Sequence, residues 1–71
     1  MAKVIKAHIT GTVWKIEVKV GDSVDEGTVV AILESMKMEM PVESEEVGVV
    51  QEILVTEGQA VTEGAVLVAL A

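Results

Sequence analysis

Residues 11–34, "GTVWKIEVKVGDSVDEGTVVAILE", recur in altered form at residues 48–71, "GVVQEILVTEGQAVTEGAVLVALA". The two segments align at an offset of 37 residues without a gap, and ten of the 24 aligned positions are identical. All six glycines of the protein form matched pairs, at positions 11 and 48, 21 and 58, and 27 and 64. Because every glycine has a counterpart, we interpret the chain as an internal duplication.

Each half has the pattern of β-strands. Residues 14–20, "WKIEVKV", alternate apolar and charged side chains, which predicts a half-buried strand with Trp14 on its apolar face. Residues 21–27, "GDSVDEG", have the composition of a turn, and residues 28–34, "TVVAILE", predict a buried strand. The second half repeats this order, and no segment has a helical period.

Two units of this size are too small to bury their apolar faces separately. The chain has 71 residues, of which 51% are hydrophobic, with no cysteine, phenylalanine or tyrosine. We therefore expect one all-β domain over residues 1–71, built as two packed sheets or a flattened barrel with pseudo-twofold symmetry. The duplication extends weakly to units 4–34 and 41–71, which leaves residues 35–40, "SMKMEM", between them.

Charge and composition exclude several functions. The formal net charge is −7 and there is no arginine, which argues against nucleic-acid binding. No apolar run has the length of a membrane span, so no membrane partner is expected. The single histidine, His8, has no second ligand for a metal and is read as a surface residue without a catalytic role. We expect a non-catalytic, cytoplasmic protein.

The junction between the units carries an isolated lysine. Lys37 is the only cation from residue 20 to residue 71, a span that holds eleven of the twelve carboxylates. Met36, Met38 and Met40 surround it. One interpretation is a continuous strand whose methionines fill the core. The other is an exposed link on the symmetry axis with a lysine accessible to enzymatic acylation. The only aromatic residue, Trp14, is expected to pack in the core or against a hairpin.

Residues 34–44, "ESMKMEMPVES", resemble the attachment motif of biotinyl domains, Ala-Met-Lys-Met, in which the lysine carries biotin in amide linkage. The flanking repeats resemble the strands of the biotinyl/lipoyl attachment family, closest to its small standalone members. The resemblance implies a barrel-sandwich hybrid of two four-stranded antiparallel sheets. It places Met36 and Lys37 at the centre of a tight hairpin turn within residues 35–40, flanked by Met38. Local residues alone predict a continuous strand there, because "SMKM" has no Gly, Asn or Pro.

The resemblance also implies a carrier function. Lys37 would be biotinylated by a biotin protein ligase, and the domain would carry carboxyl groups between a biotin carboxylase and a carboxyltransferase. An alternative is lipoate, attached to Lys37 by a lipoyl ligase for a 2-oxoacid dehydrogenase-type complex. Lipoyl domains usually have Asp before the lysine and Ala after it, so Met36 and Met38 favour biotin, while Ser35 in place of the usual Ala leaves dual modification open. A second alternative is an unmodified structural adaptor.

Overall fold

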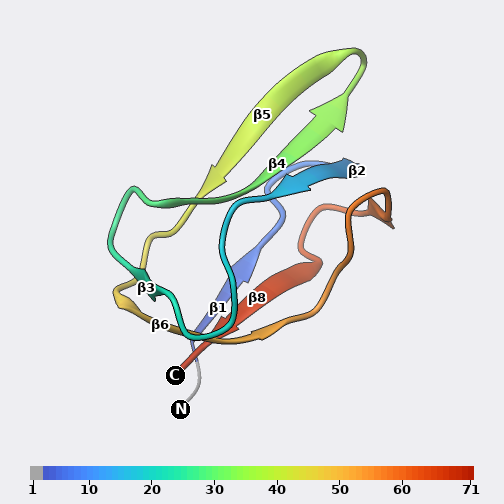
Figure 1. The fold of residues 1–71 in the computed structure, drawn as a ribbon. Coiled ribbons are helices and arrows are strands. Elements are labelled where there is room, and N and C mark those ends of the chain that lie inside the picture. The colour runs from blue at the N-terminus through green and yellow to red at the C-terminus, as the bar shows by residue number, and fades with distance from the viewer. Residues whose placement is uncertain (1–2) are drawn as a thin grey trace.

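The computed structural model describes residues 3–71, which fold into eight β-strands without a helix (Figure 1). The strands are β1 (Lys3–Lys6), β2 (Gly11–Ile16), β3 (Ser23–Val24), β4 (Val29–Ser35), β5 (Met38–Glu43), β6 (Gly48–Ile53), β7 (Ala60–Val61) and β8 (Val66–Leu70). Across this described part of the chain, no helix is long and apolar enough to cross a membrane. The all-β prediction is confirmed.

The strands form two four-stranded antiparallel sheets, with the orders β1-β8-β6-β3 and β5-β4-β2-β7. The molecule is elongated, with principal extents of 32 × 18 × 17 Å. Figure 1 shows the β4–β5 hairpin projecting at one end, while the two ends of the described chain lie together at the other. The predicted pair of four-stranded sheets is therefore confirmed.

Strand pairing follows the duplication residue by residue. Leu33 on β4 pairs with Met40 on β5, and 37 residues later Leu70 on β8 pairs with Lys3 on β1. The register of each strand pair also shifts at the equivalent place. In the β4–β5 pair the shift lies between residues 29 and 31, and in the β1–β8 pair it lies between residues 66 and 68. The predicted pseudo-twofold symmetry is thus present in the register as well as in the sequence.

The buried residues of the core are related by the same pseudo-twofold symmetry. Its buried side chains come from both sheets and fall into eight pairs with a separation of 37 residues: Ile5 with Val42, Ala7 with Ser44, Val13 with Val50, Val18 with Val55, Val24 with Val61, Val30 with Leu67, Ala31 with Val68, and Leu33 with Leu70. Only Ser44 among them is polar, and its hydroxyl donates a hydrogen bond to the Glu46 carbonyl oxygen at 2.6 Å. One apolar core therefore serves both halves.

The strand predicted over residues 14–20 is wrong in its extent, and its predicted buried face is correct only at Ile16 and Val18. β2 ends at Ile16, and its register with β4 shifts between Val13 and Lys15. Such a bulge places two residues opposite one and resets the alternation, which a period-2 pattern does not reveal. Val13 occupies the core with 1% exposure, whereas Trp14 is 48% exposed. The expectation that Trp14 packs in the core is therefore also wrong.

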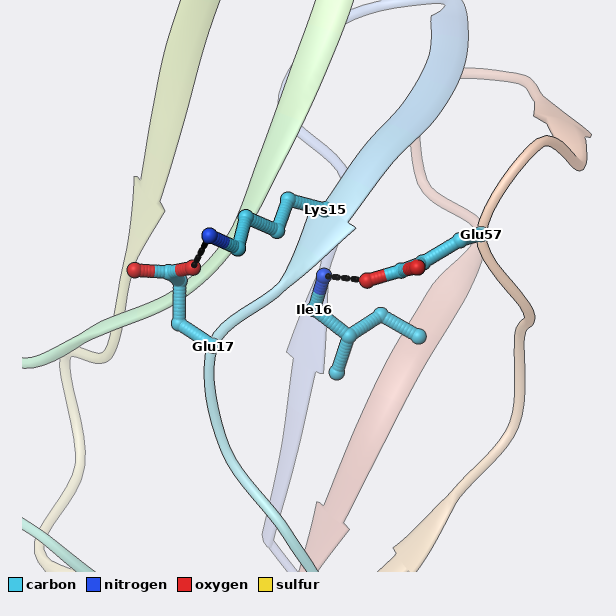
Figure 2. Close-up of polar contacts among 4 residues, drawn as sticks. All are labelled: Lys15, Ile16, Glu17 and Glu57. Atoms are coloured by element: carbon cyan, nitrogen blue, oxygen red, sulfur yellow. Dashed lines mark hydrogen bonds and ion pairs between the residues drawn. The ribbon is translucent and has the colours of Figure 1, made fainter.

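Polar contacts form at the C-terminal end of β2 (Figure 2). The Glu57 carboxylate accepts a hydrogen bond from the Ile16 backbone N–H at 3.1 Å, which satisfies a donor at the point where the strand ends. Lys15 and Glu17 form an exposed ion pair at 3.8 Å, a class of contact that contributes little to stability. Val20 stands at the position equivalent to Glu57, so the other half has no matching carboxylate.

The two strand-initial glycines provide a test of the packing between β2 and β4. A Cβ on Gly11 would lie 2.5 Å from the Glu34 carbonyl oxygen, whereas one on the equivalent Gly48 would lie 3.1 Å from the Ala71 oxygen. We expect Gly11→Ala to destabilise the fold by about 1–3 kcal/mol, because backbone atoms must move. Gly48→Ala, the matched control, should cost clearly less. Thermal unfolding of both variants measures this, and equal melting temperatures would contradict the expectation.

Candidate functional site

The projecting hairpin contains a two-residue turn. Ser35, the last residue of β4, pairs with Met38, the first residue of β5, and Met36 and Lys37 connect them. The turn centre implied by the family resemblance is therefore confirmed. The continuous strand that local residues predicted is wrong, because the chain reverses within these two residues.

Both turn residues have an unusual backbone conformation. Met36 has φ = 53° and Lys37 has φ = 64°, and no other residue except glycine has positive φ among residues 3–71. Positive φ at both central positions is the requirement of a type I′ hairpin turn, for which Asn-Gly is the favoured sequence. A side chain in this region costs of order 1–3 kcal/mol. The six residue pairs along β4 and β5 hold the turn in place despite that cost.

The methionines beside the lysine are exposed. Met36 is 91% and Met38 is 58% exposed, while Met40, which pairs with Leu33, is half-buried. The interpretation of all three as core residues is therefore wrong. The physical reason is the length of the hairpin, since β2 pairs with β4 only as far as Glu34. Beyond that point no strand within residues 3–71 other than β4 and β5 reaches the turn.

Close packing reaches the base of the turn at Ser35. The Ser35 Cβ would lie 3.5 Å from a Cβ built on Gly11, and the Ser35 side chain is half-buried. Its hydroxyl adds polarity without adding bulk relative to alanine.

The charges around Lys37 are negative and unpaired. Glu34 and Glu39 are exposed and lie directly opposite each other across β4 and β5. Like charges in this arrangement are destabilising. Within residues 3–71 Lys37 has neither an ion-pair nor a hydrogen-bond partner. The ammonium group is thus exposed in an acidic environment and is not engaged by the fold.

A groove lies between the edge strands β1 and β5. This open groove of about 700 Å³ has Ile5 and Val42 among its lining residues, together with Lys6, His8 and Glu43. His8 is exposed there, as expected of a surface residue. No cluster suited to a metal ion occurs in the described range. The sequence indicated neither the groove nor its position, because both depend on which strands are left at the sheet edges.

The fold and the turn define a class of protein. The chain belongs to the Biotin_lipoyl family, described as "biotin-requiring enzyme", which matches residues 1–70. It is 46% identical over 66 residues to the biotin/lipoyl attachment protein of Bacillus subtilis, covering 93% of this chain and 90% of that protein. It is 40% identical over 70 residues to the biotin carboxyl carrier protein of Streptococcus mutans, covering 99% of this chain and 54% of that protein.

Solved structures give the same result. The urea carboxylase of Kluyveromyces lactis matches with a TM-score of 0.92 and 35% identity, over 100% of this chain and 6% of that one. A single-chain, multi-domain long-chain acyl-CoA carboxylase matches with a TM-score of 0.88 and 28% identity, over 96% of this chain and 7% of that one. This chain is therefore a biotin carrier domain, homologous to the biotinyl domains of much larger carboxylases, and the family resemblance is confirmed.

The family implies covalently attached biotin, and the hairpin fits such a group. Amide attachment needs an accessible amine, and this structure has one at a projecting turn that no other strand covers. The neighbouring side chains of Met36 and Met38 are exposed, so they leave the approach to the amine open.

The strain in the turn can be tested through stability. Met36→Asn places at a positive-φ position a residue that adopts this conformation readily. We expect about 1 kcal/mol of stabilisation, which raises the melting temperature by roughly 4–8 °C in a domain of this size. Met38→Asn is the control, because residue 38 is in an extended strand where asparagine brings no gain. Equal effects of both changes would show that the turn is not strained.

Proposed function

We propose that Lys37 is the residue that carries biotin. The observation that supports this most directly is the position of Lys37 at the centre of an exposed two-residue turn, beyond the last strand pairing of β2. Two other lysines make side-chain contacts within the fold. The Lys3 ammonium donates a hydrogen bond to the Val47 carbonyl oxygen at 2.7 Å, and Lys15 pairs with Glu17.

Attachment needs an activated acyl group. A biotin protein ligase would use ATP to convert the biotin carboxylate to an acyl-adenylate, with release of pyrophosphate. The Lys37 Nζ then attacks the acyl carbon, an amide bond forms, and AMP and a proton leave. A lysine amine is mostly protonated near neutral pH, so the ligase has to accept a proton before the attack.

The chain itself acts as a tether. When bound, biotin accepts a carboxyl group at a biotin carboxylase and delivers it at a carboxyltransferase. The contribution of this chain is to hold the attachment point at a rigid, exposed turn, which raises the effective concentration of the group at each partner. We propose that the chain is not itself an enzyme, and that it works in the cytoplasm with these two enzymes and the ligase.

Lipoate is the second candidate. The supporting observation is the 46% identity to the Bacillus subtilis protein, whose name gives both biotin and lipoyl attachment. The same exposed amine of Lys37 would accept lipoate from a lipoyl ligase, and the product would serve a 2-oxoacid dehydrogenase-type complex. Ser35, where alanine is usual, lies at the base of the turn that either ligase would contact.

The attachment residue can be tested by Lys37→Arg. The variant should incorporate no biotin when incubated with a biotin protein ligase, ATP and biotin, as measured by intact mass. Its melting temperature should stay close to that of the wild type, because an exposed turn side chain contributes little packing. Lys6→Arg and Lys15→Arg are the controls and should gain one biotinyl group. Continued labelling of Lys37→Arg would show that another lysine is the acceptor.

The flanking methionines are expected to determine the choice of cofactor. We expect Met36→Asp combined with Met38→Ala to shift modification from biotin towards lipoate, because both side chains are exposed beside Lys37 where a ligase reaches them first. Parallel assays with a biotin protein ligase and a lipoyl ligase measure the ratio, and thermal melts monitor the fold. A lower melting temperature with an unchanged ratio would mean that the methionines serve stability instead.

A further inference from the structure

The sheet that carries Lys37 has a row on its outer face in which apolar side chains lie beside one lysine. Lys15, Ile32 and Pro41 pair across β2, β4 and β5. This row faces outward, since the adjacent rows contain fully buried residues, Leu33 on one side and Ala31 on the other. Trp14 is the extra residue of the bulge beside Lys15 and is 48% exposed. We call Trp14, Ile32 and Pro41 the outer row.

The opposite sheet supplies an internal comparison. At an offset of 37 residues the same backbone positions carry Gln51, Ala69 and Val4. The register and the bulge are equivalent, since β6 shifts against β8 between Val50 and Glu52. The fold therefore accepts a polar residue at the position of Trp14 and a small one at the position of Ile32, whereas the position of Pro41 is apolar in both sheets. An exposed tryptophan on only one of the two faces is not explained by folding, and tryptophan is one of the residues enriched at the energetically dominant centres of protein interfaces.

The outer row is close enough to the turn to be covered by the same partner. Pro41 is four residues from Lys37 along β5, which is about 13 Å in an extended strand. A standard protein interface covers about 800 Å² on each partner, a disc roughly 32 Å across. An enzyme that binds Lys37 from this side of the hairpin therefore also covers the outer row. The equivalent residues on the opposite sheet, which include Gln51, lie outside that contact.

We propose that the outer row is the docking surface for the biotin protein ligase that modifies Lys37, an inference that rests on the proposed function. The ligase is the partner that must approach most closely, because its acyl-adenylate has to reach bonding distance of the bare Lys37 amine. Partners that act on the modified domain are reached through the added length of the biotinyl arm. The matching ligase surface has an apolar pocket for Trp14, with cations nearby facing Glu34 and Glu39.

Two variants test this by installing the residues of the opposite face. Trp14→Gln copies Gln51, and Ile32→Ala copies Ala69. We expect Trp14→Gln to raise the KM of the ligase for this chain at least tenfold with kcat unchanged, and Ile32→Ala to raise it by a smaller factor. Gln51→Ala on the far sheet is the matched control and should change KM by less than twofold. Melting temperatures separate loss of docking from loss of folding, and Ile32→Ala remains informative if Trp14→Gln unfolds.

Direct contact can be observed without turnover. Trp14 is the only tryptophan, so fluorotryptophan labelling of the Lys37→Arg chain gives a single ¹⁹F resonance. This resonance should shift or broaden when unlabelled ligase is added. An unchanged resonance, or an unchanged KM for folded Trp14→Gln, overturns the proposal.

Three further outcomes would also overturn it. A defect of biotinylated Trp14→Gln only in carboxylation would assign the outer row to a carboxylase. Self-association of the wild type that Trp14→Gln abolishes, measured by ultracentrifugation, would assign it to a second copy of this chain. Failure of the wild type to incorporate biotin would instead remove the proposed function itself, which distinguishes the two claims.

Discussion

The architecture depends on the exchange of strands between the two halves of the chain. Each sheet contains two strands from each repeat, so that β3 of the first half pairs with β6 of the second and β7 of the second pairs with β2 of the first. Backbone hydrogen bonds reinforce the exchange, since the Gly58 N–H donates to the Val13 oxygen at 2.7 Å and the Gly21 N–H to the Val50 oxygen at 2.8 Å. Neither half alone can complete a sheet or bury Leu33 and Leu70. This exchange of strands therefore also determines where the β4–β5 hairpin extends beyond the core.

The duplication made much of this predictable from sequence. Equal spacing of glycines and valines at an offset of 37 residues indicated the strands and the symmetry, because each repeated apolar position needs an equivalent environment. The bulge at Trp14 was not predictable, since an extra residue changes the buried face without changing the composition. The turn at Met36 and Lys37 was not predictable from its own residues either. Its conformation is imposed by the strand register on both sides, which overrides local preference.

The hairpin violates local rules that the rest of the fold obeys. Two side chains adopt positive φ, two carboxylates face each other across the strands, and two methionines are exposed. Each feature is unfavourable for an isolated hairpin, and none has a counterpart that compensates for it in residues 3–71. Such conflicts concentrate at functional sites, where surrounding structure maintains an arrangement that function requires. The shared core provides that support here, because Val30, Ala31 and Leu33 on β4 are fully buried in it.

The two ends of the described chain lie at the end of the molecule opposite the β4–β5 hairpin, so the folded domain has the geometry of a rigid spacer (Figure 1). The long dimension is 32 Å. A flexible Gly/Ser linker would need roughly 34 residues to give the same root-mean-square span. Such a linker would also sample many shorter end-to-end distances. The folded domain keeps a constant length, so no chain entropy is lost when its hairpin binds a partner. A domain joined to a larger chain through these ends would hold its projecting hairpin at a constant distance from the point of attachment.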